Sequence, residues 1–272
     1  VTDDSRLVMR VLAEAIHDGA QAINYLKAET LITNEQGSVV GATLKDTSSE
    51  DNAQNNVQSN VESYDVYAKV VVSAIGAWAD TLRMQASKQT EHSFHKQIRP
   101  SRGSHLVVSK ERLPIEQAYT FLHPVDKRAV FVFPWENRTV LGTTDLDHPP
   151  LDDSEVGITN EEVDYLLTAT NELFNDVKLN RKDVISTWAG VRPLISEGGD
   201  GKRVSPSKEK RDHSVWLDNN LVTVSGGKLT TFRLIALDVL EKCQEVLALD
   251  KSVIQKQTLN DDHVFSDTAP TN

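Results

Sequence analysis

The apolar run Val70–Ile75, inside "AKVVVSAIGAWAD", constrains the fold of this chain more than any other feature, and it ends at Gly76. Apolar residues that follow one another without alternation are typical of a strand covered on both faces, as in a parallel sheet. A second strand-to-helix junction lies in "LVTVSGGKLTTFRLIA", near the other end of the chain. We therefore predict an α/β domain built from both ends of the sequence.

The middle of the chain shows a different pattern. Between residues 98 and 147 the stretches "SHLVV", "AVFVFPW" and "TVLGTTD" predict strands, and the "ENR" turn between the last two indicates an antiparallel sheet. A helix follows, because Thr159 and Glu162 have the spacing of a capping box ahead of an apolar stripe. The predicted fold class is α/β with an inserted α+β domain.

Composition excludes several classes of function. With a formal net charge of −11 over 272 residues, and no concentration of Lys and Arg, the chain has no footprint for nucleic acid. A single cysteine, Cys243, excludes an internal disulfide and fits a reducing compartment, so we expect a cytoplasmic protein. No apolar run is long enough for a membrane span, and the opening "VTDDSRLVMR" is not a signal peptide.

The stretch "SGGKLTTFR", Ser225 to Arg233, is the strongest local signal for binding. Two glycines between a strand and a helix let the backbone approach a ligand closely, and the N–H groups at the helix start favour a negative charge. Lys228 adds a mobile positive charge. A plain tight turn with a solvated lysine explains this stretch equally well. The spacing of a Walker A loop is absent, as is "GxGxxG".

Five segments together resemble one family. "DDSRLVMRVLAEAIHDGA", "IRPSRGSHLVV", "FVFPWENRTVLGTTD", "TWAGVRPL" and "GGKLTTFRLIA" resemble segments of FAD-dependent glycerol-3-phosphate dehydrogenases of the aerobic type, in that family's order. Two departures are Phe232, where the family usually has Tyr, and "SAIGAWAD" in place of "NATGPWAD". The family's opening "GxGxxG" segment and its helical cap are missing, so we expect a fragment that is incomplete for catalysis.

The resemblance implies a fold and its division. The fold would be part of a glutathione-reductase-like FAD-binding fold, with a substrate domain on a mainly antiparallel sheet. Residues 1–90 would form the later part of the FAD-binding domain, with a mobile loop at 47–62, and residues 91–212 the substrate domain. Residues 213–258 would return to the FAD-binding domain with the GGK loop and its helix, and 259–272 would form a tail.

The resemblance also implies roles for single residues. Arg192 would bind the phosphate of glycerol 3-phosphate, Lys228 would be a second cation, and His105 would accept the hydroxyl proton. All three are therefore the expected catalytic and substrate-binding residues. The expected contacts with FAD come from the Gly76 turn and the GGK loop, where backbone N–H groups would stabilise charge on the flavin: Gly76, Trp78, Gly226, Gly227, Lys228, Leu229 and Thr230.

The product would be dihydroxyacetone phosphate, with a quinone as the acceptor of electrons or oxygen in an oxidase relative. Any membrane contact would be peripheral, on the inner face of the cytoplasmic membrane. Two other functions stay open: an FAD-dependent oxidoreductase acting on an amino acid, and a non-catalytic domain that binds a phosphorylated metabolite.

The remaining polar candidates carry weaker expectations. Arg99 and Arg102 flank the His105 strand and could support phosphate or flavin, whereas Asp145 is expected to be structural. His92 and His95 have an i, i+3 spacing but no third ligand nearby, so we expect no metal site.

Overall fold

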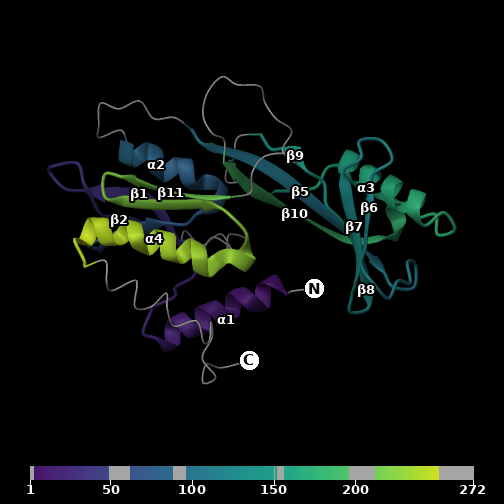
Figure 1. The fold of residues 1–272 in the computed structure, drawn as a ribbon, viewed down its shortest axis with the longest axis horizontal. Coiled ribbons are helices and arrows are strands. Elements are labelled where there is room, and N and C mark those ends of the chain that lie inside the picture. The colour runs from purple at the N-terminus through teal and green to yellow at the C-terminus, as the bar shows by residue number, and fades with distance from the viewer. Residues whose placement is uncertain are drawn as a thin grey trace. The chain divides into compact units, whose positions relative to one another are not determined.

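The computed structural model describes residues 3–48, 62–87, 96–149, 151, 156–195 and 212–250 (Figure 1). The chain divides into two compact units. Unit 1 comprises Val1–Ile75, Ala79–Phe94 and His213–Asn272, and unit 2 comprises Gly76–Trp78 and His95–Asp212. Three expectations fall wholly or almost wholly outside the described residues: the loop at 47–62, the His92 and His95 pair, and the tail at 259–272.

Unit 1 contains three of the four α-helices in the described part of the chain: α1 (Asp4–His17), α2 (Ala79–Ser87) and α4 (Phe232–Leu247). Helix α1 begins where the Asp3 side chain accepts a hydrogen bond from the Arg6 amide, at 3.0 Å. It ends ahead of Gly19, whose φ of 95° suits glycine and breaks the helix.

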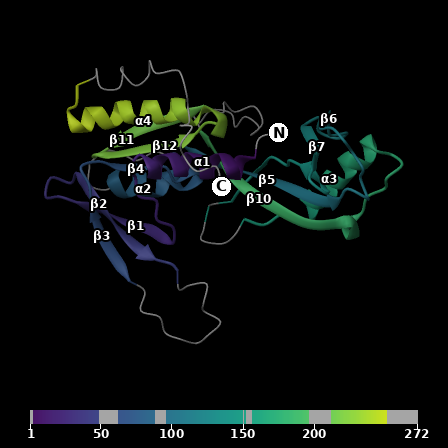
Figure 2. The same ribbon diagram turned by 90° about the horizontal axis from the view of Figure 1, so that it is seen from below.

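Two sheets complete unit 1. The antiparallel order β1-β2-β3 joins Leu26–Thr33, Val39–Asp46 and Ser63–Tyr67, and the order β11-β12-β4 joins His213–Asp218, Leu221–Gly226 and Val71–Ser73. In the second sheet β12 pairs with β4 in parallel, so the apolar run Val70–Ile75 contributes a strand to a parallel pair, as predicted. Helices α2 and α4 lie on opposite faces of this sheet (Figure 2).

One expectation about β4 is wrong. The strand covers only Val71–Ser73, and it is not buried on both faces, since Val72 is 45% exposed and Ile75 is 38% exposed. Val71 and Ser73 point to the other face, where Val71 packs against the core formed by Val39, Leu82, Ala86 and Leu221. Among the described segments, β4 is an edge strand, and Val72 is partly exposed at this edge, although its neighbour Val222 on β12 is buried.

Unit 2 is built on one antiparallel sheet, as predicted. Its order is β10-β5-β8-β7-β6, with β9 paired to β5. The strands are β5 (Ile98–Ser109), β6 (Tyr119–Leu122), β7 (Ala129–Trp135), β8 (Arg138–Gly142), β9 (Leu146–Asp147) and β10 (Val184–Ile195). Helix α3 (Asn160–Leu173) packs on one face of the sheet, and Leu106, Leu141 and Leu166 are fully buried between them.

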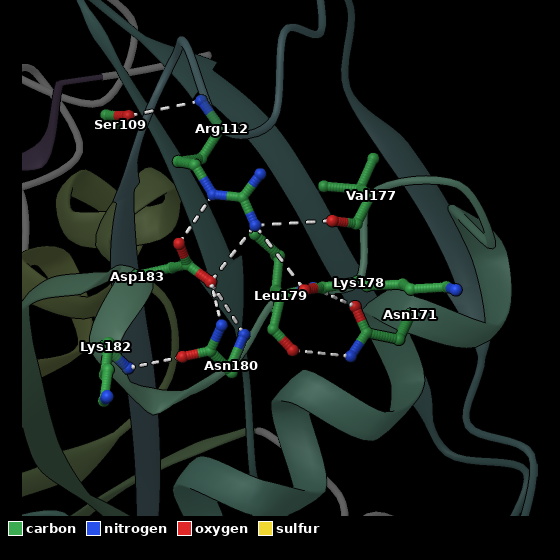
Figure 3. Close-up of polar contacts among 9 residues, drawn as sticks. All are labelled: Ser109, Arg112, Asn171, Val177, Lys178, Leu179, Asn180, Lys182 and Asp183. Atoms are coloured by element: carbon green, nitrogen blue, oxygen red, sulfur yellow. Dashed lines mark hydrogen bonds and ion pairs between the residues drawn. The ribbon is translucent and has the colours of Figure 1, made fainter.

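The ends of α3 are held by polar contacts. Thr159 and Glu162 form the predicted capping box, in which each side chain accepts a hydrogen bond from the other residue's amide. Beyond the helix, Arg112 forms a two-pronged ion pair with Asp183, at 2.6 and 3.2 Å, and Asn171 bonds to the backbone of Leu179 in both directions (Figure 3). These contacts fix the connection from α3 to β10, the strand that carries Arg192.

Candidate active site

His105 and Arg192 lie on the same face of the unit 2 sheet. His105 of β5 is directly opposite Trp188 of β10, and Arg192 of β10 is opposite Ser101 of β5. Partners across an antiparallel pair share a face, and residues two apart along a strand do so as well. The face opposite α3 therefore carries the two residues that were expected to bind phosphate and accept a proton.

Two glycines leave room for these side chains. A Cβ at Gly142 would lie 2.1 Å from the imidazole Cδ2 of His105, and one at Gly103 would lie 2.3 Å from the guanidinium Nη2 of Arg192. Real side chains do not approach so closely, so the imidazole and the guanidinium occupy space that only glycine leaves free. By contrast, a Cβ at Gly190, which faces Gly103 across the strands, would meet nothing within 4 Å.

The connection after β8 supports Arg192. The Nη2 of Arg192 donates to the hydroxyl of Thr143 at 3.1 Å, and its Nη1 lies 3.7 Å from a carboxylate oxygen of Asp145. Asp145 also accepts hydrogen bonds from the Ser101 hydroxyl and, at its backbone carbonyl, from Arg128. The guanidinium therefore has a fixed position beside an ion-pair partner, with about a third of the side chain exposed.

His105 sits in a setting that favours its neutral form. Its ring stacks on that of Trp188, with centroids 4.8 Å apart and planes inclined by 12°. Burial, followed by the positive charge of Arg192, lowers the pKa of His105 from 6.5 to about 4. Its Nδ1 is buried and has no hydrogen-bond partner among the described residues. A neutral imidazole with an unused nitrogen can accept a proton.

The GGK loop lies in unit 1 and has the backbone expected of a binding turn. Gly226 and Gly227 have φ of 84° and 78°, in the left-handed region, and a Cβ at Gly227 would come within 2.6 Å of Ile235. The loop leads into the short helix η5 (Leu229–Thr231) and then α4. The first N–H groups of such a helical start have no partner within the helix and can donate to a ligand.

Gly76 has a φ of 61° and begins the short helix η2 (Gly76–Trp78), which lies against β5 and β10. Trp78 is 40% exposed, and a Cβ at Gly76 would meet nothing within 4 Å. The turn thus brings an aromatic ring and an unobstructed piece of backbone to the sheet that carries His105. Its predicted role toward a cofactor stays a prediction.

Arg99 and Arg102, which were expected to support phosphate or flavin, each form an ion pair within unit 2. Arg99 binds both carboxylate oxygens of Asp147, at 2.6 and 2.8 Å, and Arg102 pairs with Glu162 at 2.9 Å on the α3 face of the sheet. Neither shares a partner with Arg192 in the contacts above.

Sequence reasoning missed four residues at this site: Gly103, Gly142, Thr143 and Trp188. They are recognised only from strand register and contacts. The described residues contain no group of three or more His, Cys, Asp and Glu that could hold a metal ion. No helix in the described part of the chain is long and apolar enough to cross a membrane.

Residues 1–236 match the family described as FAD dependent oxidoreductase. The chain belongs to this family. Like other FAD dependent oxidoreductases it has a mixed α/β fold, so the predicted fold class and the predicted resemblance are both confirmed.

Individual relatives indicate a narrower group within this family. The chain is 35% identical to the aerobic glycerol-3-phosphate dehydrogenase of Bacillus subtilis (strain 168) over 254 residues, which cover 90% of this chain and 40% of the relative. It is 35% identical to the aerobic glycerol-3-phosphate dehydrogenase of Staphylococcus haemolyticus (strain JCSC1435) over 241 residues, 88% of this chain and 40% of that one. This FAD dependent oxidoreductase chain thus spans about 40% of the length of these curated relatives.

Solved structures agree. The glycerol-3-phosphate dehydrogenase from Bacillus halodurans complexed with FAD superposes with a TM-score of 0.75 at 34% identity, covering 92% of this chain and 44% of the other. The FAD-bound L-alpha-glycerophosphate oxidase from Mycoplasma pneumoniae gives a TM-score of 0.57 at 19% identity, over 88% and 54% of the two chains, which supports the fold alone.

Proposed function

We propose that this chain carries the substrate site and part of the cofactor site of an FAD-dependent glycerol-3-phosphate dehydrogenase. The reaction converts sn-glycerol 3-phosphate to dihydroxyacetone phosphate. The observation that carries the proposal is that neutral His105 and the guanidinium of Arg192 lie on the same face of the sheet. A phosphorylated secondary alcohol needs both a cation for the phosphate and an acceptor for the hydroxyl proton.

Arg192 would bind the phosphate. A guanidinium donates two parallel hydrogen bonds to two phosphate oxygens, and Thr143 and Asp145 hold this one in place. Lys228 would supply a second positive charge at the end of the GGK loop. The dianion also acts on the base: by neutralising the charge of Arg192, bound phosphate would raise the pKa of His105 from about 4 and make it a better proton acceptor.

His105 would take the proton of the C2 hydroxyl as the C–H bond at C2 breaks. The alcohol thereby loses the hydroxyl proton to the imidazole. The hydrogen on C2 leaves with both electrons of the C–H bond, as hydride, and a ketone remains. FAD, when bound, supplies the acceptor for that hydride. Trp188 excludes water from one side of the imidazole, which holds the base in its neutral form.

The residues of the GGK loop fit the cofactor. Gly226 and Gly227 present a backbone without side chains at left-handed positions, and the N–H groups of Leu229 and Thr230 begin a helical turn, so the loop is suited to the polar edge of a flavin. Gly76 and Trp78 would complete the contacts. In this proposal residues 1–90 and 213–258 serve the cofactor and residues 91–212 serve the substrate.

The electrons would then pass to a quinone, with a peripheral position of the protein on the inner face of the cytoplasmic membrane. The support is the similarity to relatives named aerobic glycerol-3-phosphate dehydrogenases. Mixing the reduced protein with a soluble quinone or with oxygen, and following flavin reoxidation, tests this step. Reoxidation that is fast only with oxygen would refute it.

The function is tested by adding glycerol 3-phosphate, without oxygen, to the complete native protein loaded with FAD. We expect the visible flavin band to bleach in the wild type and in Arg181→Ala, a control that removes an arginine paired with Asp164. Bleaching should be lost in His105→Gln and Arg192→Ala.

A stable flavin spectrum in the wild type would refute the proposal. Bleaching by an amino acid such as glycine instead would support the amino-acid oxidoreductase. Binding of glycerol 3-phosphate without bleaching would support a non-catalytic domain.

A further inference from the structure

Glu162, at the start of α3, is the most fully hydrogen-bonded carboxylate described in unit 2. It is 2% exposed. One oxygen accepts from the hydroxyls of Ser104 and Thr144, at 2.8 and 2.7 Å, and from the Nε of Arg102 at 3.4 Å. The other accepts from the Thr159 amide and from Arg102, each at 2.9 Å. This is far more than a helix cap requires.

The partners of Glu162 are chain neighbours of the residues at the candidate active site. Arg102 and Ser104 bracket Gly103, the glycine that leaves space for Arg192, and Ser104 directly precedes His105. Because side chains alternate along β5, Glu162 holds the strand from the α3 face at residues 102 and 104, while residues 103 and 105 serve the opposite face. The position of His105 therefore depends on contacts made behind the sheet.

Thr144 transmits a second constraint. Its hydroxyl donates to Glu162 and accepts from the Ser104 amide at 3.0 Å, so it ties the connection after β8 to both α3 and β5. On either side of it stand Thr143, which accepts from Arg192, and Asp145, which pairs with Arg192. One buried carboxylate thus holds both the strand of the base and the loop that orients the phosphate fork.

We propose that Glu162 is a positioning residue for substrate binding and proton transfer, acting through Ser104, Arg102 and Thr144. The inference rests on the function proposed above. Its geometry requires an ionised carboxylate, since Glu162 accepts every one of these bonds. Burial works to raise its pKa, but the hydrogen bonds from Thr144, Thr159 and Ser104, with the charge of Arg102, outweigh burial and lower it.

The test compares Glu162→Gln with Glu161→Gln in the native polypeptide loaded with FAD. Both remove one negative charge from the first turn of α3, but Glu161 is exposed. Stopped-flow reduction by glycerol 3-phosphate gives the substrate Kd and the rate constant of reduction separately. In E162Q we expect a higher Kd and a slower reduction, on the order of 10-fold to 100-fold in the two combined, since a displacement of about 1 Å has such an effect. E161Q should behave as the wild type.

A second variant covers the case in which E162Q does not fold. Thr144→Val leaves the charge of Glu162 in place and removes one hydroxyl, and we expect the same direction of change. It also permits a test without substrate, by NMR titration of the His105 imidazole. If Thr144 positions the site, the pKa of His105 moves from about 4 toward 6.5, because Arg192 and the surrounding side chains withdraw.

The proposal is overturned if folded E162Q and T144V retain the wild-type Kd and reduction rate. Failure of the wild type to react with glycerol 3-phosphate would refute the proposed function instead. The titration of His105 then decides the positioning role alone: an upward shift in T144V supports it, and an unchanged pKa overturns it.

Discussion

The substitution Gly103→Ala tests whether the missing side chain at residue 103 leaves the space that Arg192 needs at the proposed phosphate site. The new Cβ would lie 2.3 Å from Nη2 of Arg192 and 2.6 Å from both Cζ and Nη1. To regain ordinary contact distances, the guanidinium must move by about 1 Å. Because the clash involves the end of a flexible side chain, we expect the free energy of unfolding to change by less than about 1 kcal/mol.

Substrate binding should respond much more strongly. A movement of about 1 Å breaks the alignment of the guanidinium with two phosphate oxygens, so one of two charge-assisted hydrogen bonds is lost, at about 1.5–3 kcal/mol. This corresponds to a substrate Kd that is about 10-fold to 150-fold higher. The Kd is measured by the change in the flavin spectrum on titration with dihydroxyacetone phosphate, and unfolding is followed in urea by circular dichroism.

Gly190→Ala is the matched control. Gly190 faces Gly103 across β5 and β10, and its Cβ would enter open space, so the free energy of unfolding should remain that of the wild type. The reasoning is refuted if G103A binds as tightly as the wild type. It would also fail if G103A lost most of its stability, since the clash would then be absorbed by the backbone.

Three further outcomes are expected. Burial, followed by a neighbouring positive charge, lowers the pKa of His105 to about 4 from 6.5. Between these pH values the unfolded chain binds the extra proton, so the free energy of unfolding should fall as the pH drops from 6.5 to 4, by on the order of 2–3 kcal/mol, and His105→Gln should lack this part of the loss in urea titrations. Trp188→Leu removes the stacked ring and should raise the pKa of His105 in an NMR titration; an unchanged value would mean that other groups keep water away. Arg83→Met removes the ion pairs of this buried arginine with Asp80 and Asp218 and should lower the free energy of unfolding in urea by about 2 kcal/mol. No loss would mean that packing alone stabilises α2.

Local signals in the sequence were sufficient for much of the fold. The cap at Thr159 depends on residues within a few positions, and it was predicted correctly. That β4 belongs to a parallel pair was also predicted, from its unbroken apolar run, although its partner β12 was not. Burial of β4 on both faces was not, since coverage depends on which segments pack against the strand rather than on its own residues.

The composition of the candidate site could not be predicted in the same way. His105 and Arg192 became candidates by resemblance alone, whereas the glycine pair at the strand-to-helix junction had already drawn attention to Lys228. Trp188 was missed because its position depends on a bulge in β10, between Val184 and Ser186. Counted from Val184 without that bulge, Trp188 would lie opposite Ser104, on the α3 face, and would not touch His105.

The same register explains why the glycines carry as much of the site as the charged residues do. A one-residue slip would place Gly103 away from Arg192 and Gly142 away from His105. The guanidinium and the imidazole would then need space that a side chain occupies. Glu162 holds β5 at the residues on either side of Gly103, so contacts on the α3 face help to keep this glycine beside the guanidinium of Arg192. Substitutions on the α3 side of the sheet should therefore move His105 and Arg192, and so impair the proposed activity, without touching either residue.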